Sequence, residues 1–228
     1  MRRGHEAAAH GRTWENSYHL DPEAERRFIA DCVDVIVRVT GQKPVGWNAY
    51  WMRNSPRTLD ILQSLGFLYH IDEPSRDEPF IVPLKGGDFV TVPYTFHMND
   101  IVSFPFQGRN PAAYEQAVKD EFDQLYEEGA HRRRMMVDSL HDRISGHANR
   151  VRMLDRFLTH AKSTPGVWFA RKDEIARWAL NDWRAPEQTY SLTGIQTALG
   201  ARQVFGGDSV AAQNWQLAKR SLIHQSTL

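Results

Sequence analysis

Cysteine is nearly absent from this sequence of 228 residues. The single cysteine, Cys32, cannot form a disulfide within the chain, so nothing in the sequence requires an oxidising compartment. No apolar run approaches the roughly 20 residues needed to cross a membrane. Residues 1–11 also lack the apolar segment of a signal peptide. Together these absences predict a cytoplasmic protein.

An excess of charge of either sign is also missing. Lys and Arg together number 28, and so do Asp and Glu, so the formal net charge is zero. A balanced chain has no broad electrostatic field to attract nucleic acid or anionic lipid. The one basic run, residues 131–134, leads into an apolar strand pattern, and we interpret it as a solvated strand entry. We therefore expect a small-molecule substrate, with no nucleic-acid and no membrane partner.

Helix and strand patterns alternate along the chain, which predicts an α/β fold. A first helix is expected between an Asp21-Pro22 cap and Gly41. Further helices are expected from about residues 55, 110, 151 and 173, and strands at 44–47, 67–69, 135–137 and 167–169, with a glycine-turn hairpin over 80–92.

The pattern dissolves beyond Asp182, where only a weak helical run, residues 210–222, is visible. We therefore expect a barrel-like domain over residues 1–181 and a tail of uncertain structure over 182–228. The domain has about four or five β/α units, whereas a closed barrel of such units needs seven or eight. Either the sheet is open or the first part of a barrel is absent from this sequence.

Several polar residues follow predicted strands, where the reactive groups of β/α barrels collect. His10 and His141 are the sharpest pair for general acid–base chemistry, since histidine titrates nearest to neutral pH. A lone histidine is nevertheless more often a plain surface residue, and Trp14 and Trp47 are as readily core residues as substrate platforms. No metal motif stands out, because His5 and His10, five residues apart, point to different sides of a helix or strand.

Residues 4–15 resemble the second motif of the polysaccharide deacetylase (NodB homology) family, in which a strand-end histidine enters a metal site. His10 matches the first ligand position, but the second falls on Trp14. The "HG-x-x-W" form is similar to the allantoinase-like branch, whose members hydrolyse amide bonds of small ring compounds without relying on the metal. Further stretches match this branch in order, at residues 44–59, 66–80, 92–100, 140–147 and 166–178.

The resemblance implies a seven-stranded (β/α) barrel, incomplete here because its N-terminal strands and first acidic motif have no counterpart. It implies His141 as the acid or base and His10 as the residue that orients water. The resemblance then requires no cofactor. A divalent metal such as zinc would bind His10, but Trp14 at the second ligand position disfavours a metal. The implied substrate-binding residues are Trp14, Trp47, Arg53, Asp77, Asn99 and Asp100.

Three hypotheses remain open at this stage. The first is a hydrolase of carbon–nitrogen bonds acting on a cyclic ureide, an imide or a related small amide. The second is a metal-dependent N-acetyl-sugar deacetylase, which conflicts with Trp14 and with Asn48, because the stretch 47–50 lacks the arginine of the motif that such enzymes carry there. The third is a catalytically inactive fragment of a barrel. The resemblance also leaves a homo-oligomer open.

Overall fold

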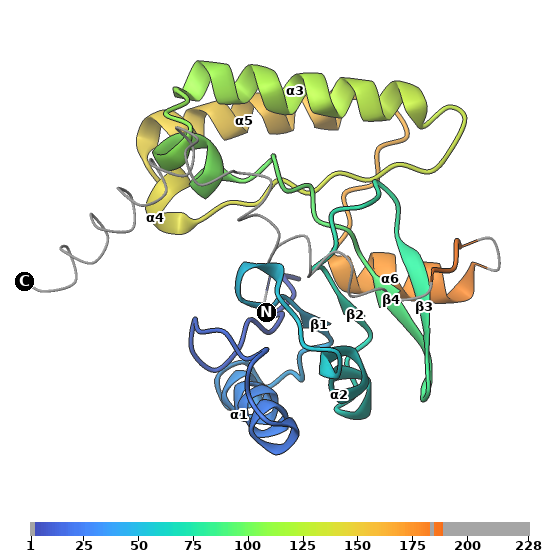
Figure 1. Ribbon diagram of the computed structural model, residues 1–228. Coiled ribbons are helices and arrows are strands. Elements are labelled where there is room, and N and C mark those ends of the chain that lie inside the picture. Colours follow the sequence, from blue (N-terminus) through green and yellow to red (C-terminus); the bar gives the residue numbers. More distant parts are fainter. Residues whose placement is uncertain (1–2, 183–184, 189–228) are drawn as a thin grey trace, which may run out of the picture. The chain divides into compact units, whose positions relative to one another are not determined.

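The computed structural model describes residues 3–182 and 185–188, and these residues form two compact units (Figure 1). The first, here called the sheet unit, comprises residues 3–94, 133–135, 168–182 and 185–188. The second, the helical unit, comprises residues 95–132 and 136–167.

The sheet unit contains a four-stranded sheet in the order β1-β2-β4-β3. Its strands are β1 (Gly46–Trp47), β2 (Tyr69–His70), β3 (Phe80–Leu84) and β4 (Gly87–Thr91). β1 pairs with β2, and β2 with β4, in parallel, whereas β3 and β4 form the predicted antiparallel hairpin. Ala9 also bridges to Trp47 in parallel, so the segment that ends at His10 lies beside β1.

Gly46 lies where β1 and β2 approach most closely. A Cβ atom at this position would sit 2.1 Å from the Cζ atom of the Tyr69 ring, so only glycine fits. The Tyr69 hydroxyl donates a hydrogen bond to Glu6 Oε1 at 2.7 Å, and Glu6 Oε2 accepts one from the backbone N–H of Asp173 at 3.1 Å. Burial, reinforced by Glu6, raises the pKa of Tyr69 well above its ordinary value, so its hydroxyl keeps the proton that it donates.

Three helices flank this sheet: α1 (Pro22–Thr40), α2 (Thr58–Ser64) and α6 (Lys172–Asn181). The predicted ends of α1 are confirmed. The Asp21 side chain accepts a hydrogen bond from the backbone N–H of Ala24 at 2.8 Å, and Gly41 closes the helix with φ 71°. α2 begins at Thr58 and not at residue 55 as predicted. The Thr58 hydroxyl binds the Ser55 backbone N–H at 2.8 Å and so caps the turn before the helix.

Two apolar clusters form the core of the sheet unit. One joins α1 and α2 to the sheet through Ile29, Leu59, Leu62, Trp47 and Phe67. The other joins α6 to the sheet through Tyr69, Val90, Val92, Ala176 and Ala179. Helices thus pack on the sheet through two separate apolar clusters, which is the layering that an α/β sequence pattern predicts.

The helical unit consists of η2 (Val102–Phe106), α3 (Pro111–Glu128), α4 (Asp142–Ser145) and α5 (Ala148–Ser163). α3 begins as predicted, because the Asn110 side chain accepts a hydrogen bond from the Ala113 N–H at 2.9 Å. The long helices α3 and α5 lie side by side (Figure 1) around a core that includes Tyr114, Val118, Met153 and Phe157.

Two predicted strands do not form. Residues 135–137 and 167–169 belong to no strand, and near the first of them the described chain has an isolated parallel bridge, Asn99 to Ser139. Trp168 and Phe169 are 58% and 54% exposed, so no sheet covers their side chains. An apolar pattern predicts only the tendency to be extended, whereas a strand also requires a neighbour that completes its hydrogen bonds.

The remaining predictions on the fold concern the tail and the membrane. The weak helical run at residues 210–222 lies outside the described residues. Within residues 3–182 and 185–188, no helix combines the length and the apolar character that a membrane span requires.

Candidate functional site

His10 stands at the end of the segment that pairs with β1. The backbone of Ala9 exchanges hydrogen bonds with Gly46 and Asn48, which fixes the segment against the strand. The Nδ1 atom of His10 lies 2.7 Å from the carbonyl oxygen of Asn48. A carbonyl oxygen only accepts, so Nδ1 carries the proton, and in the neutral ring the lone pair is on Nε2. The His10 side chain is exposed, which suits a group that exchanges protons with a solute.

Asp72 is a buried carboxylate of the sheet unit whose two oxygen atoms both accept hydrogen bonds. It is 8% exposed and lies two residues beyond β2. Its Oδ1 accepts hydrogen bonds from the Asn48 side chain and from the Ala49 backbone N–H, both at 2.7 Å, and its Oδ2 accepts one from the Asn54 side chain at 2.9 Å. These three donors offset the cost of burying a carboxylate. Asn48 therefore holds His10 with its carbonyl group and Asp72 with its side chain.

His70 extends this network across the sheet. Its Nε2 lies 2.9 Å from the Thr91 hydroxyl on β4, and its Nδ1 lies 3.3 Å from the Asp72 backbone nitrogen. The Asp72 N–H can only donate, so these contacts fit the tautomer with the proton on Nε2. His70 and Thr91 are fully buried. The loop that carries Asn48 is thus tied to the sheet interior through Asp72 and His70.

The helical unit contains a histidine–aspartate pair. The Nδ1 atom of His141 lies 2.5 Å from Oδ1 of Asp100, and the His141 backbone N–H donates to Oδ2 at 2.7 Å. The Ser145 hydroxyl donates to the same Oδ2 at 2.7 Å. Asp100 is fully buried, whereas the His141 side chain is 31% exposed. A buried carboxylate bound to Nδ1 fixes the tautomer and leaves Nε2 for proton exchange.

A second carboxylate, Asp138, lies in the same unit. Burial raises its pKa to about 6, an effect that the hydrogen bond from the Tyr114 hydroxyl at 2.5 Å opposes and the negative charge of Asp100 reinforces. Tyr114 is fully buried at the start of α3. Asp138 therefore changes its charge near pH 6, beside the pair formed by Asp100 and His141.

The other predicted site residues take different positions. Trp14 is 54% exposed, whereas Trp47 is 2% exposed in the core of the sheet unit, where its ring packs edge-on against Phe67. The Trp47 indole nitrogen is buried and has no hydrogen-bond partner among the described residues. Arg53 is half-buried at the end of η1 (Tyr50–Met52), and the carbonyl of half-buried Asp77 accepts a hydrogen bond from the Met135 N–H at 2.7 Å.

Asn99 and Asp100 share a turn that is stabilised locally. The Asn99 side chain accepts a hydrogen bond from the Ile101 N–H at 3.0 Å, and its carbonyl accepts two more from the start of η2. The structure therefore separates the predicted residues into two sets: His10, Trp14, Trp47, Arg53 and Asp77 in the sheet unit, and Asn99, Asp100 and His141 in the helical unit.

Asp72 and Asn48 were not assigned to the site from the sequence. Both follow predicted strands, and Asp72 also falls in the matching stretch at residues 66–80, so these two signals pointed to them. Neither signal reveals that they bind each other, because they are 24 residues apart.

The described residues do not fit a catalytic zinc ion. Such an ion takes about three protein ligands, and within residues 3–182 and 185–188 no group of three or more His, Cys, Asp or Glu side chains could hold a metal. His10 is a single ligand, and Trp14, at the second motif position, offers no lone pair to a metal.

The sequence and the structure of the chain are similar to those of known proteins. No model of a protein family matches the chain. A protein of Schizosaccharomyces pombe described as a polysaccharide deacetylase is 31% identical over 191 residues, which are 76% of this chain and 60% of that protein. Among solved structures, one described as a polysaccharide deacetylase from Pseudomonas aeruginosa PAO1 is 36% identical with a TM-score of 0.72.

The structure of PuuE allantoinase is 34% identical, also with a TM-score of 0.72. Each of the two structures matches 79% of this chain, which covers 61% of each. The chain thus spans about three fifths of the length of these three relatives.

Proposed function

Because the chain belongs to the polysaccharide deacetylase (NodB homology) family, we propose that it hydrolyses a carbon–nitrogen bond other than a peptide bond. The substrate class that we propose is a cyclic ureide, an imide or a related small amide. The likeness to an allantoinase structure and the tryptophan at position 14 support this class over an N-acetyl sugar. For the fold, we propose that the sheet unit is part of a seven-stranded (β/α) barrel.

The observation that carries the proposal is the pair formed by Asp100 and His141. Hydrolysis of an amide needs an activated water, stabilisation of the tetrahedral oxyanion and a proton for the leaving nitrogen. His141 has its Nδ1 bound to a buried carboxylate and its side chain partly exposed, so Nε2 is the atom that takes or gives the proton. We assign to Asp100 the positioning of His141 and not contact with substrate, because its carboxylate is buried and already accepts three hydrogen bonds.

His10 has the complementary role in this proposal. Its Nδ1–H is held by the Asn48 carbonyl, so Nε2 can accept a hydrogen bond from water or hold a proton. Arg53 and Asn99 are proposed to bind the ureide or imide, a planar group rich in matched donors and acceptors. No step passes through a metal ion, because the described donor set does not fit one.

The experiment is a hydrolysis assay of the purified 228-residue chain on two panels. One contains cyclic ureides and imides, with ring opening followed by the new carboxylate; the other contains N-acetylated sugars, with acetate release followed. We expect ring opening, lost in His141→Ala and retained in His160→Ala. His160 is a matched control, because it pairs with Asp123 at 2.6 Å on the surface of the same unit. Acetate release without ring opening would overturn the proposed substrate class in favour of N-acetyl sugars. Inactivity on both panels would support the hypothesis of a catalytically inactive fragment.

A further inference from the structure

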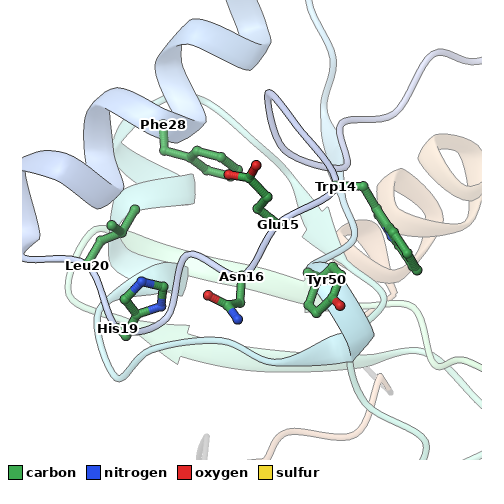
Figure 2. Close-up of a pocket in the computed structure, with 7 residues that line it drawn as sticks. All are labelled: Trp14, Glu15, Asn16, His19, Leu20, Phe28 and Tyr50. Carbon is green, nitrogen blue, oxygen red and sulfur yellow. The ribbon is translucent and has the colours of Figure 1, made fainter. Parts of the chain in front are cut away.

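The sheet unit carries a pocket in which Trp14 is the one lining residue that the resemblance assigns to substrate binding. It has a volume of about 460 Å³ and lies between the segment that follows His10, the helix α1 and the turn η1 (Figure 2). Trp14, Glu15, Asn16 and His19 line it from the segment, and Tyr50 lines it from η1. This volume falls within the range of about 300–1,000 Å³ typical of small-molecule sites.

Two aromatic rings form a corner at this pocket. The ring centroids of Trp14 and Tyr50 are 4.9 Å apart, and the ring planes meet at 64°. Trp51 supports Trp14 from 6.2 Å, on a turn that is held at the left-handed φ of 50°. Trp14 nevertheless remains 54% exposed, so part of its indole is free to meet a ligand. The face of an aromatic ring carries partial negative charge and attracts cations.

The pocket lining carries negative charge, as the faces of the aromatic rings do. Glu15 is its only acidic side chain, and no Lys or Arg lines the pocket. Within the described part of the chain, the Glu15 carboxylate has no hydrogen-bond or ion-pair partner, so its charge is not neutralised internally. An anionic ligand would meet repulsion from the carboxylate and the ring faces alike, and a neutral ligand would gain no charge attraction from either. A cation gains from both.

We propose that this pocket binds a small organic ammonium ion. The cation lies against the indole of Trp14 and the phenol ring of Tyr50, and Glu15 balances its charge. Asn16 and His19 supply hydrogen bonds to polar groups of the ligand; His19 lies at the far side of the pocket from Trp14, and Asn16 lies between His19 and Tyr50 (Figure 2). Binding of this kind involves no turnover, so the inference does not depend on the proposed hydrolysis.

The first test compares two ligands of the same shape. Calorimetric titration of the full chain with choline is expected to show binding. The neutral carbon isostere of choline, in which carbon replaces nitrogen, is expected to bind about tenfold more weakly or worse, because it loses the cation–π and ion-pair attractions together. Equal affinity for the two ligands, or no binding of choline, would overturn the proposal.

The second test uses matched variants. Glu15→Gln and Trp14→Ala are each expected to weaken choline binding about fivefold, and Glu15→Gln to leave the isostere unaffected. Glu23→Gln and Trp168→Ala are the controls, since both residues are exposed in the sheet unit and lie outside the pocket; they should leave binding unchanged. Circular dichroism checks folding, and Trp14→Phe, which keeps a ring, replaces Trp14→Ala if that variant unfolds. Unchanged choline binding in Glu15→Gln would contradict the assignment.

Discussion

His141 donates two hydrogen bonds to one buried carboxylate, that of Asp100. One comes from its backbone N–H and one from Nδ1, so both the chain and the ring are fixed relative to Asp100. A histidine held in this way has a defined tautomer and a defined orientation of Nε2. The consequences can be tested separately from the identity of the substrate.

Replacing either member of this pair should affect turnover and not substrate binding. With whichever small amide the chain hydrolyses, we expect His141→Ala to lower kcat by about 10²- to 10⁴-fold, the usual contribution of a general acid or base. Asp100→Asn should also lower kcat, with KM nearly unchanged, because the amide no longer enforces the tautomer. Steady-state kinetics measure both effects, with His160→Ala as the control. A rise in KM at constant kcat would assign the pair to substrate binding instead.

Asp138 predicts how the stability of the chain depends on pH. Its pKa is raised from 3.8 to about 6, so the folded chain holds this proton more tightly than the unfolded chain. The resulting stabilisation is fully present below pH 3.8 and is lost as the pH rises through 6, amounting to at most about 3 kcal/mol. In Asp138→Asn, which keeps an acceptor for the Tyr114 hydroxyl, this loss should be absent.

Denaturant unfolding at pH 4 and pH 7 measures the effect of Asp138. The free energy of unfolding of Asp138→Asn, relative to the natural chain, should increase between the two pH values. The exposed residue Asp155 on α5 gives the control variant Asp155→Asn, for which no such trend is expected. A constant difference between Asp138→Asn and the natural chain would show that Asp138 titrates normally.

Asp72 should be essential to the stability of the sheet unit. Asp72→Asn has nearly the same shape but offers one acceptor oxygen to the donors of Asn48, Ala49 and Asn54, so at least one of these N–H groups loses its partner. We expect a loss of about 2 kcal/mol or more in the free energy of unfolding. Urea denaturation measures it. Asp60→Asn, at an exposed position on α2, should change the value by less than about 0.5 kcal/mol. Equal effects of the two substitutions would refute the role given to Asp72.

Removal of metal ions tests whether the proposed hydrolysis is independent of a metal. We expect a chelator such as EDTA to leave hydrolysis unchanged and added zinc not to increase it. Activity that disappears with the chelator and returns with zinc would support the metal-dependent deacetylase. Metal analysis of the protein before and after treatment confirms that the ions were removed.

The elements that the sequence predicted correctly are those stabilised by near neighbours. α1 and α3 begin at Asp21 and Asn110, whose side chains bind N–H groups three residues further along the chain. The β3–β4 hairpin closes within a few residues. The strands predicted at residues 135–137 and 167–169 failed, because a strand depends on partners that the local pattern does not contain.

The site residues His10, Asp100 and His141 were predicted from motif resemblance and strand-end position, and their roles stay a prediction. That Asp100 is the residue that holds His141 could not be predicted, because 41 residues separate the two. In the sequence, a tryptophan in a predicted strand such as Trp47 can line a substrate pocket or lie in the core, and the pattern does not distinguish the two. Only packing against Phe67 distinguishes Trp47 as a core residue.

The close approach of Gly46 and Tyr69 also limits how this protein can evolve. A single added methyl group at position 46 would displace the Tyr69 ring, and with it the hydroxyl that binds Glu6 and, through Glu6, the start of α6. Three segments distant in sequence would have to change together to accept it. We therefore expect homologues to vary at positions 6, 46 and 69 as a group, so that a lineage keeps all three residues or replaces all three.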